Sequence, residues 1–239
     1  MRFKCRFLKK KFLLLLITLG IGSALYANDE LKSLADSLRR MIDEKPLFIQ
    51  QKEQRINRIK CLLKGSGLTL EQKYKINFQL CNEYKKFVVD SAIHYVDQKI
   101  ARKLNNRDLK NQSSLQLSLL YSMCGRYRDA ELILEKIKTS ELSKDLLSVY
   151  YETYSRFWEY YSITANSRYG KQRAVYQDSL LSLLDQTSFD YKLSRAYYYG
   201  GRDSIKAKTV LQELLDTEEV GTPHYAMITH AYASFCWHQ

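Results

Sequence analysis

The chain has 239 residues and a formal net charge of +12, but six of its basic side chains, and no acidic ones, lie within the first 27 residues. The remaining 212 residues have a net charge of only +6, and nucleic-acid binding needs basic side chains gathered on one face. We therefore expect no contact with nucleic acid through this region. Two prolines, nine glycines and no strand-like alternation favour an all-α chain.

The first 27 residues show the three-part pattern of a secretory signal peptide. Basic side chains between Arg2 and Lys11 precede an apolar run over residues 12–21, and small residues follow it. The run is shorter than the roughly 20 apolar residues of a membrane-spanning helix, although an uncleaved signal anchor is the alternative. We assign residues 1–27 to a signal peptide and 28–239 to one exported domain, either periplasmic or anchored in the membrane and facing the periplasm.

Apolar residues at three- and four-residue spacing predict about ten amphipathic helices along the rest of the chain. Pro46 and then Gly65 with Gly67 end the first two of them, and a capping box of Thr69 and Gln72 opens the third. The expected segments are, in chain order, 31–42, 47–64, a helix after Thr69, a helix from about Asp90, two helices within 114–137, two at 142–161 and 165–184, two within 191–215, and one from Pro223.

Residues 114–137 hold the most specific pattern of the chain. An aromatic side chain in a first helix is followed by a turn glycine, a tyrosine, an alanine where the two helices would touch, and a large apolar residue. These positions are Tyr121, Gly125, Tyr127, Ala130 and Leu134. The order resembles that of a tetratricopeptide repeat.

Two more alanines fit the same spacing. Ala92 lies 38 residues before Ala130, and Ala207 lies 77 residues after it, which is two further periods. A helical hairpin of this kind cannot bury its apolar face alone, so its neighbours must be similar units. The resemblance therefore implies a right-handed α-α solenoid of tetratricopeptide-like helical hairpins.

No pattern of catalytic, cofactor-binding or metal-binding residues is present. The four histidines form no H-E-x-x-H sequence, and no His or Cys pair has the spacing of a zinc site. There is neither a G-x-S-x-G sequence nor a glycine loop that would hold a phosphate. We expect no cofactor and no enzymatic activity.

Four cysteines follow the signal segment, and we interpret all of them as small core residues. The two nearest, Cys61 and Cys81, flank the turn at Gly65 and Gly67 at unequal distances. On antiparallel helices their offset would be about 12 Å along the axis, which is beyond the reach of a disulfide. The other two are Cys124 and Cys236.

Aromatic side chains crowd the expected helix at 142–161. One helical stripe, which includes Tyr151, Tyr154 and Trp158, is needed for packing between helices. The aromatic residues beside that stripe, and the nearby arginines, permit a second interpretation as a concave ligand surface with basic groups for an acidic ligand. The candidate groove residues are Tyr150, Arg156, Tyr160, Arg168 and Arg173.

The repeat resemblance implies binding of a protein or peptide and no catalysis. More narrowly, the chain resembles the exported N-terminal sensor region of Gram-negative envelope regulators, in which tetratricopeptide repeats precede a transmembrane helix and a cytoplasmic regulatory region. Two alternatives stay open, namely a periplasmic assembly adaptor and a glycan-binding surface protein. The second is disfavoured because Cys5 precedes the apolar run and cannot be a lipoprotein cysteine.

The last predicted helix lacks the features of a solenoid end. The segment from Pro223 has apolar residues without a polar outer face, and neither a helix cap nor a charged tail follows it. We therefore expect the domain to be truncated, with residues beyond Gln239 completing the hairpin and leading toward a membrane segment.

The signal assignment predicts the N-terminus of the exported protein. Cleavage after Ala27 leaves Asn28 at the N-terminus, and cleavage after Ala24 leaves Leu25. N-terminal sequencing of protein from a native-like host measures this. A soluble product that still begins with Met1 would contradict the assignment.

Overall fold

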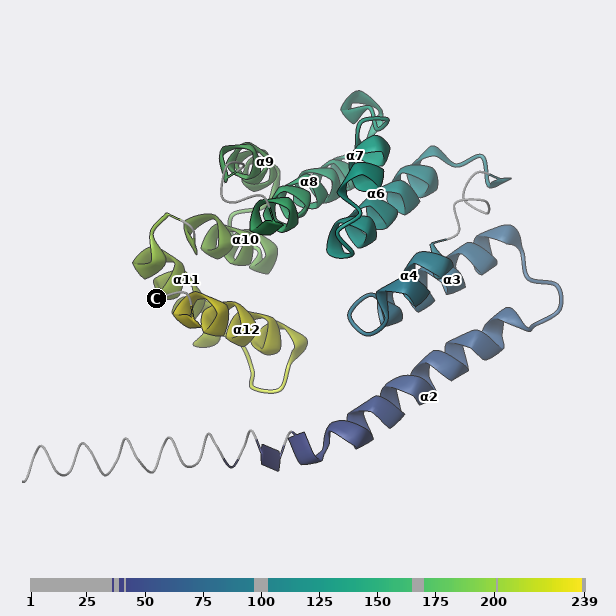
Figure 1. Cartoon of the computed structure of the whole chain (residues 1–239), viewed down its shortest axis with the longest axis horizontal. Coiled ribbons are helices and arrows are strands. Elements are labelled where there is room, and N and C mark those ends of the chain that lie inside the picture. The colour runs from purple at the N-terminus through teal and green to yellow at the C-terminus, as the bar shows by residue number, and fades with distance from the viewer. Residues whose placement is uncertain are drawn as a thin grey trace, which may run out of the picture. The chain divides into compact units, whose positions relative to one another are not determined.

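The computed structural model of this chain describes residues 36, 39–40, 42–96, 103–164, 170–200 and 202–237. Within these residues it has ten α-helices and no strand, as the sequence predicts (Figure 1). The helices are α2 (Lys45–Leu63), α3 (Leu70–Tyr84), α4 (Val89–Tyr95), α6 (Arg107–Met123), α7 (Tyr127–Leu134), α8 (Lys144–Thr164), α9 (Gly170–Leu183), α10 (Phe189–Gly200), α11 (Ser204–Leu215) and α12 (Pro223–Trp237).

The chain divides into two compact units, residues 1–58 and 59–239. The signal segment and most of the helix expected at 31–42 lie outside the described residues of the first unit. The described part of this unit is mainly α2, in which Pro46 is the second residue. A proline is favourable there because the first N–H groups of a helix have no partner within the helix.

The second unit is an all-α solenoid of stacked helical hairpins. Helices α3 and α4, α6 and α7, α8 and α9, and α10 and α11 form the hairpins, and α12 packs against α10 and α11. Successive hairpins contact each other through α4 with α6, α6 with α8, and α9 with α10. Within the part of the chain that the structure describes, no helix combines the length and the apolar character needed to cross a membrane.

Local sequence rules account for several helix ends. The Thr69 side chain accepts a hydrogen bond from the backbone N–H of Gln72 at 3.2 Å, and the Gln72 side chain accepts one from the Thr69 N–H at 2.8 Å, so the predicted capping box is confirmed. Gly125 adopts a φ of +74° at the turn between α6 and α7, a conformation that residues with a Cβ rarely adopt. The chain can therefore reverse within three residues.

The repeat residues lie where the two helices of each hairpin meet. Ala92, Ala130 and Ala207 are all fully buried. The Ser118 hydroxyl of α6 donates a 3.1 Å hydrogen bond to the Ala130 carbonyl of α7, so the helices touch at this point. The first helix of each of these hairpins also has a fully buried small residue, namely Cys81, Ser118 and Ala196. Of these, only Cys81 is predicted from the sequence as a core residue.

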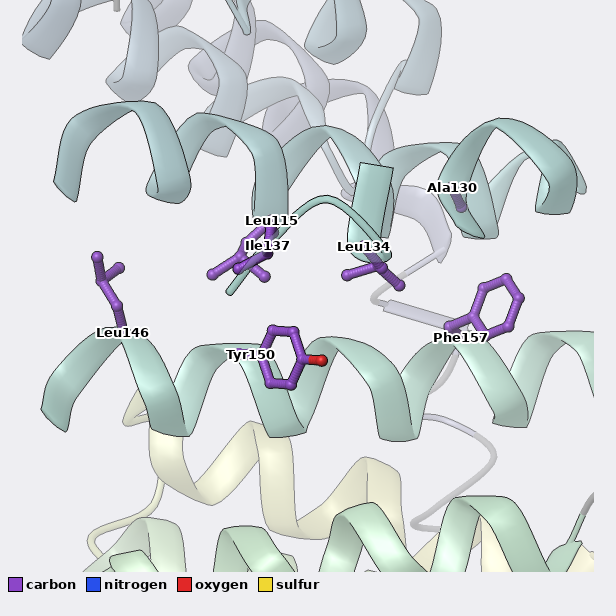
Figure 2. Packing of buried hydrophobic residues seen from close by; sticks show 7 residues of the cluster. All are labelled: Leu115, Ala130, Leu134, Ile137, Leu146, Tyr150 and Phe157. Atoms are coloured by element: carbon purple, nitrogen blue, oxygen red, sulfur yellow. The ribbon is translucent and has the colours of Figure 1, made fainter. Parts of the chain in front are cut away.

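An apolar cluster joins the α6–α7 hairpin to α8. Figure 2 shows Leu134 and Ile137 on one side and Tyr150 and Phe157 of α8 on the other. Leu134 is fully buried, as expected. The complete set of buried members is Leu115, Ala130, Leu134, Ile137, Leu146, Tyr150 and Phe157. This packing covers the apolar face that a single hairpin would leave exposed.

The tyrosines of the repeat pattern join neighbouring elements. The Tyr127 hydroxyl donates to the Tyr160 carbonyl at 3.0 Å, and its ring contacts Phe157 and Tyr161 edge to face. The half-buried ring of Tyr121 lies under the Arg126 guanidinium, whose central carbon is 4.1 Å from the ring centroid.

The cysteines only partly agree with the prediction that all are core residues. Cys81 is fully buried, and burial raises the pKa of its thiol to about 11. Cys61 and Cys124 are exposed, so the prediction is wrong for both. Cys124 caps the C-terminus of α6 and faces outward at the turn, and the surroundings of Cys236 lie outside the described residues.

The contact at Ala130 predicts the effect of a larger side chain. Ala130→Phe should lower the free energy of unfolding by about 1–3 kcal/mol, because the added ring has no space between α6 and α7. Leu132→Phe is the control, since Leu132 lies on the same helix and is 37% exposed. Chemical denaturation compares the variants with the wild type, and equal stabilities for all three proteins would refute the close-contact assignment.

Candidate functional site

Two neighbouring hollows lie on the second unit, and both are lined by Glu152 and Arg156 of α8. The first, called the arginine pocket, lies among α8, α9 and α10 and has a volume of about 40 Å³. It is lined by Glu152, Ser155, Arg156, Glu159, Arg173, Gln177, Leu180, Ser194 and Tyr197. A water needs roughly 10–15 Å³ of such space, so a group of about three atoms fits.

The second hollow, called the apolar pocket, lies among α3, α6 and α8 and has a volume of about 210 Å³. It is lined by Phe78, Lys85, Gln112, Leu115, Gln116, Leu119, Val149, Glu152, Thr153 and Arg156. Leu115 is fully buried at its base, whereas Val149 is 41% exposed. The pocket thus has apolar walls and a polar border.

A Tyr74 hydrogen-bond network fixes α3 against α6 beside this pocket. The Tyr74 hydroxyl donates to the Gln112 side-chain oxygen at 3.0 Å and accepts from the Ser113 hydroxyl at 3.2 Å. Burial raises the pKa of Tyr74, so the phenol keeps its proton. The network holds the walls of the apolar pocket in place.

One carboxylate joins the two arginines of the arginine pocket. Glu159 Oε2 is 3.1 Å from Arg156 Nη1, and Glu159 Oε1 is 3.2 Å from Arg173 Nη2. The three side chains are only 35%, 25% and 25% exposed for Arg156, Arg173 and Glu159 respectively. Within the described residues, the buried Nε of Arg173 has no hydrogen-bond partner. The pocket therefore has more donors than the protein itself satisfies.

Arg156 has its charge fixed by its surroundings. Burial acts to lower the pKa of its guanidinium, but the charges of Glu159 and Glu152 outweigh burial and the pKa is raised. The guanidinium carbon also lies 5.1 Å from the centroid of the Tyr197 ring of α10. Arg156 thus stays cationic, and its side chain extends from α8 to the Tyr197 ring of α10.

The structure brings together only some of the predicted groove residues. Arg156 and Arg173 line the same pocket. Tyr160 is half-buried, and burial raises the pKa of its phenol although the charge of Arg156 opposes this. Tyr150 is 9% exposed and belongs to the core of Figure 2. Arg168 lies outside the described residues, and the ligand-binding role of all five residues stays a prediction.

Sequence reasoning missed Glu159, Gln177 and Tyr197. Glu159 follows Arg156 by three residues on one helix, a spacing at which opposite charges pair, and this signal was available. The contact of Glu159 with Arg173 depends on how α8 and α9 align, and Tyr197 comes from the next hairpin. Among the residues described, no three His, Cys, Asp or Glu side chains are arranged to hold a metal ion.

The fold and the repeat contacts define a tetratricopeptide-type scaffold, a class that generally mediates contacts between proteins and is generally non-catalytic. A family model described as the SusR N-terminal TPR domain matches residues 42–239. The chain belongs to this family and is a helical repeat scaffold of SusR-type regulators. Searches of curated proteins and of solved structures found no match.

The shared carboxylate predicts a stability effect. Glu159→Gln should lower the free energy of unfolding by about 1–2 kcal/mol, because two partly buried guanidiniums lose their charged partner. Glu131→Gln is the matched control, since its pair with Arg128 is largely exposed and such pairs contribute less than about 0.5 kcal/mol. Urea denaturation of both variants tests this, and equal losses would contradict the bridging role.

Proposed function

We propose that this chain is the extracytoplasmic sensor part of a membrane-associated transcriptional regulator and binds a protein or peptide. The single observation that supports this most is the match of residues 42–239 to the SusR N-terminal TPR domain. The signal-like pattern of residues 1–27 supports export. The proposal places the domain in the periplasm, free or anchored in the membrane.

The two pockets support binding as the task of the scaffold. Their polar and charged side chains come from four hairpins, and they include Lys85 after α3, Gln112 of α6, Arg156 of α8 and Ser194 of α10. A ligand that contacts all of these side chains binds several repeats at the same time. Solenoid surfaces recognise extended partners in this way. Ligand binding would then be sensed as a change in the contacts between hairpins.

Export can be tested through an exposed thiol. A membrane-impermeant maleimide should label Cys61, which is exposed, in intact cells whose outer membrane has been permeabilised. Cys61→Ser and Cys124→Ser variants assign the labelled sites by mass spectrometry. Labelling that occurs only after the inner membrane is broken would contradict the extracytoplasmic location.

The regulatory role can be tested by transcript profiling. Deleting the gene in its native host should change a small set of transcripts, and an Arg156→Ala, Arg173→Ala double variant should reproduce the change because the arginine pocket is lost. Immunoblotting of the exported fraction confirms that the variant accumulates. Unchanged transcripts in the deletion strain would refute the regulator, and an envelope-assembly defect in their place would favour the adaptor.

A further inference from the structure

One exposed side of α2 has the composition of a helix that lies on a membrane surface. We infer that this side of α2 binds the surface of a bilayer that contains anionic phospholipids. The inference adds a membrane contact to the proposed function, and it rests on that function only for the cellular location of the chain. Figure 1 shows α2 as one continuous helix, and the part of it over residues 45–58 belongs to the first unit.

Five exposed residues of α2 form this side, which we call the α2 stripe. At roughly 100° of rotation per residue, their positions fall within an arc of roughly 100° around the helix axis. The α2 stripe therefore presents two apolar side chains and two cations in one direction. Its members are Leu47, Phe48, Gln51, Arg55 and Arg58.

The packing of α2 does not account for the two apolar members. The buried residue of this helix is Ile56, which is only 2% exposed, and its position is roughly 130° from the centre of the α2 stripe. Leu47 and Phe48, in contrast, are 50% and 52% exposed. A single exposed apolar residue is ordinary on a protein surface, but adjacent apolar residues beside arginines are typical of helices in a membrane interface.

The charge of α2 favours an anionic surface. The helix has five basic residues and one acidic residue, so its net charge is +4 in 19 residues, whereas all 212 residues after the signal segment have +6. The acidic residue, Glu53, is roughly 140° from both Phe48 and Arg58 around the helix axis. The α2 stripe itself thus includes two cations and no anion, and clusters of basic residues near a membrane bind anionic lipids.

The apolar members favour a bilayer over a soluble polyanion. Guanidinium groups alone would bind either of them, because both present anionic oxygens. A soluble polyanion leaves Leu47 and Phe48 in water, whereas a bilayer buries them at the boundary between headgroups and acyl chains. Arg55 and Arg58 have long alkyl stems, so their guanidinium groups stay among the headgroups while the apolar side chains enter.

The position of α2 in the chain keeps it near the inner membrane after export. Residues 28–44 separate the signal segment from α2, and a chain of this length spans at most about 60 Å. One weak membrane contact is reversible, and stable attachment takes two signals. A retained signal anchor and the α2 stripe would supply both, and after cleavage the α2 stripe would attach the domain reversibly.

Vesicle binding tests the inference. The form that starts at Asn28 is sedimented with vesicles of phosphatidylethanolamine and phosphatidylglycerol in equal parts, or of phosphatidylcholine alone. It should bind the anionic vesicles, and binding should weaken as salt screens the charges. Arg55→Gln with Arg58→Gln should weaken binding by about 10- to 30-fold. The matched control is Arg128→Gln with Lys138→Gln, which removes two exposed cations of the second unit and should leave binding unchanged.

Two further variants report on the apolar members. Phe48→Trp should shift its fluorescence to shorter wavelength when anionic vesicles are added, because the ring leaves water. Ile205→Trp is the control, since Ile205 lies on α11 and is 77% exposed, and its fluorescence should not shift. Leu47→Ser with Phe48→Ser should weaken vesicle binding by at least about 10-fold. Thermal melting shows that each variant is folded before binding is compared.

Three results would overturn the inference. They are equal binding to both kinds of vesicle, an equal loss of binding in the control variant on the second unit, and unchanged Phe48→Trp fluorescence. If anionic vesicles do not bind while maleimide labelling still locates Cys61 outside the inner membrane, the α2 inference fails and the proposed location stands. If vesicles bind as expected but labelling requires a broken inner membrane, the proposed location alone fails.

Discussion

The second unit depends on how closely two helices can approach within a hairpin. At Ala130 the helices α6 and α7 are near enough for the Ser118 hydroxyl to reach the opposite backbone. This approach needs small residues on both helices and a turn that reverses at once, which Gly125 provides through its positive φ. The closed hairpin then presents Leu115 and Leu134 as one apolar face, and α8 covers it.

One side of helix α8 packs into the apolar core, and the opposite side lines the two pockets. Tyr150 and Phe157 point into the core, while Glu152, Arg156 and Glu159 line the pockets at three- and four-residue spacing. The two pockets are therefore built on a helix that also packs extensively against α6 and α9. A site on such a helix is positioned more precisely than a site on a loop.

The features that can be predicted from the sequence are those that depend on residues close together in the chain or on the repeat spacing. The capping box at Thr69 and the buried alanines follow from local chemistry and from the repeat spacing, and both are found. From the sequence, only one helical stripe of α8 is assigned to the core, and Tyr150 is therefore named as a candidate groove residue, whereas the structure buries it. A solenoid helix has neighbours on two sides, here α7 and α9, so its buried arc is wider than one stripe. The link from Glu159 to Arg173 could not be predicted, because it depends on the alignment of two helices.

The hydrogen bond from the Tyr127 hydroxyl to the Tyr160 carbonyl has a mechanical consequence. It attaches the start of α7 to the last turns of α8, one residue away from the carboxylate that pairs with both arginines. Rotation of α8 about its axis would pull on this bond and hence on the preceding hairpin. The bond therefore couples the start of α7 to the part of α8 that carries Glu159, so the preceding hairpin opposes such a rotation.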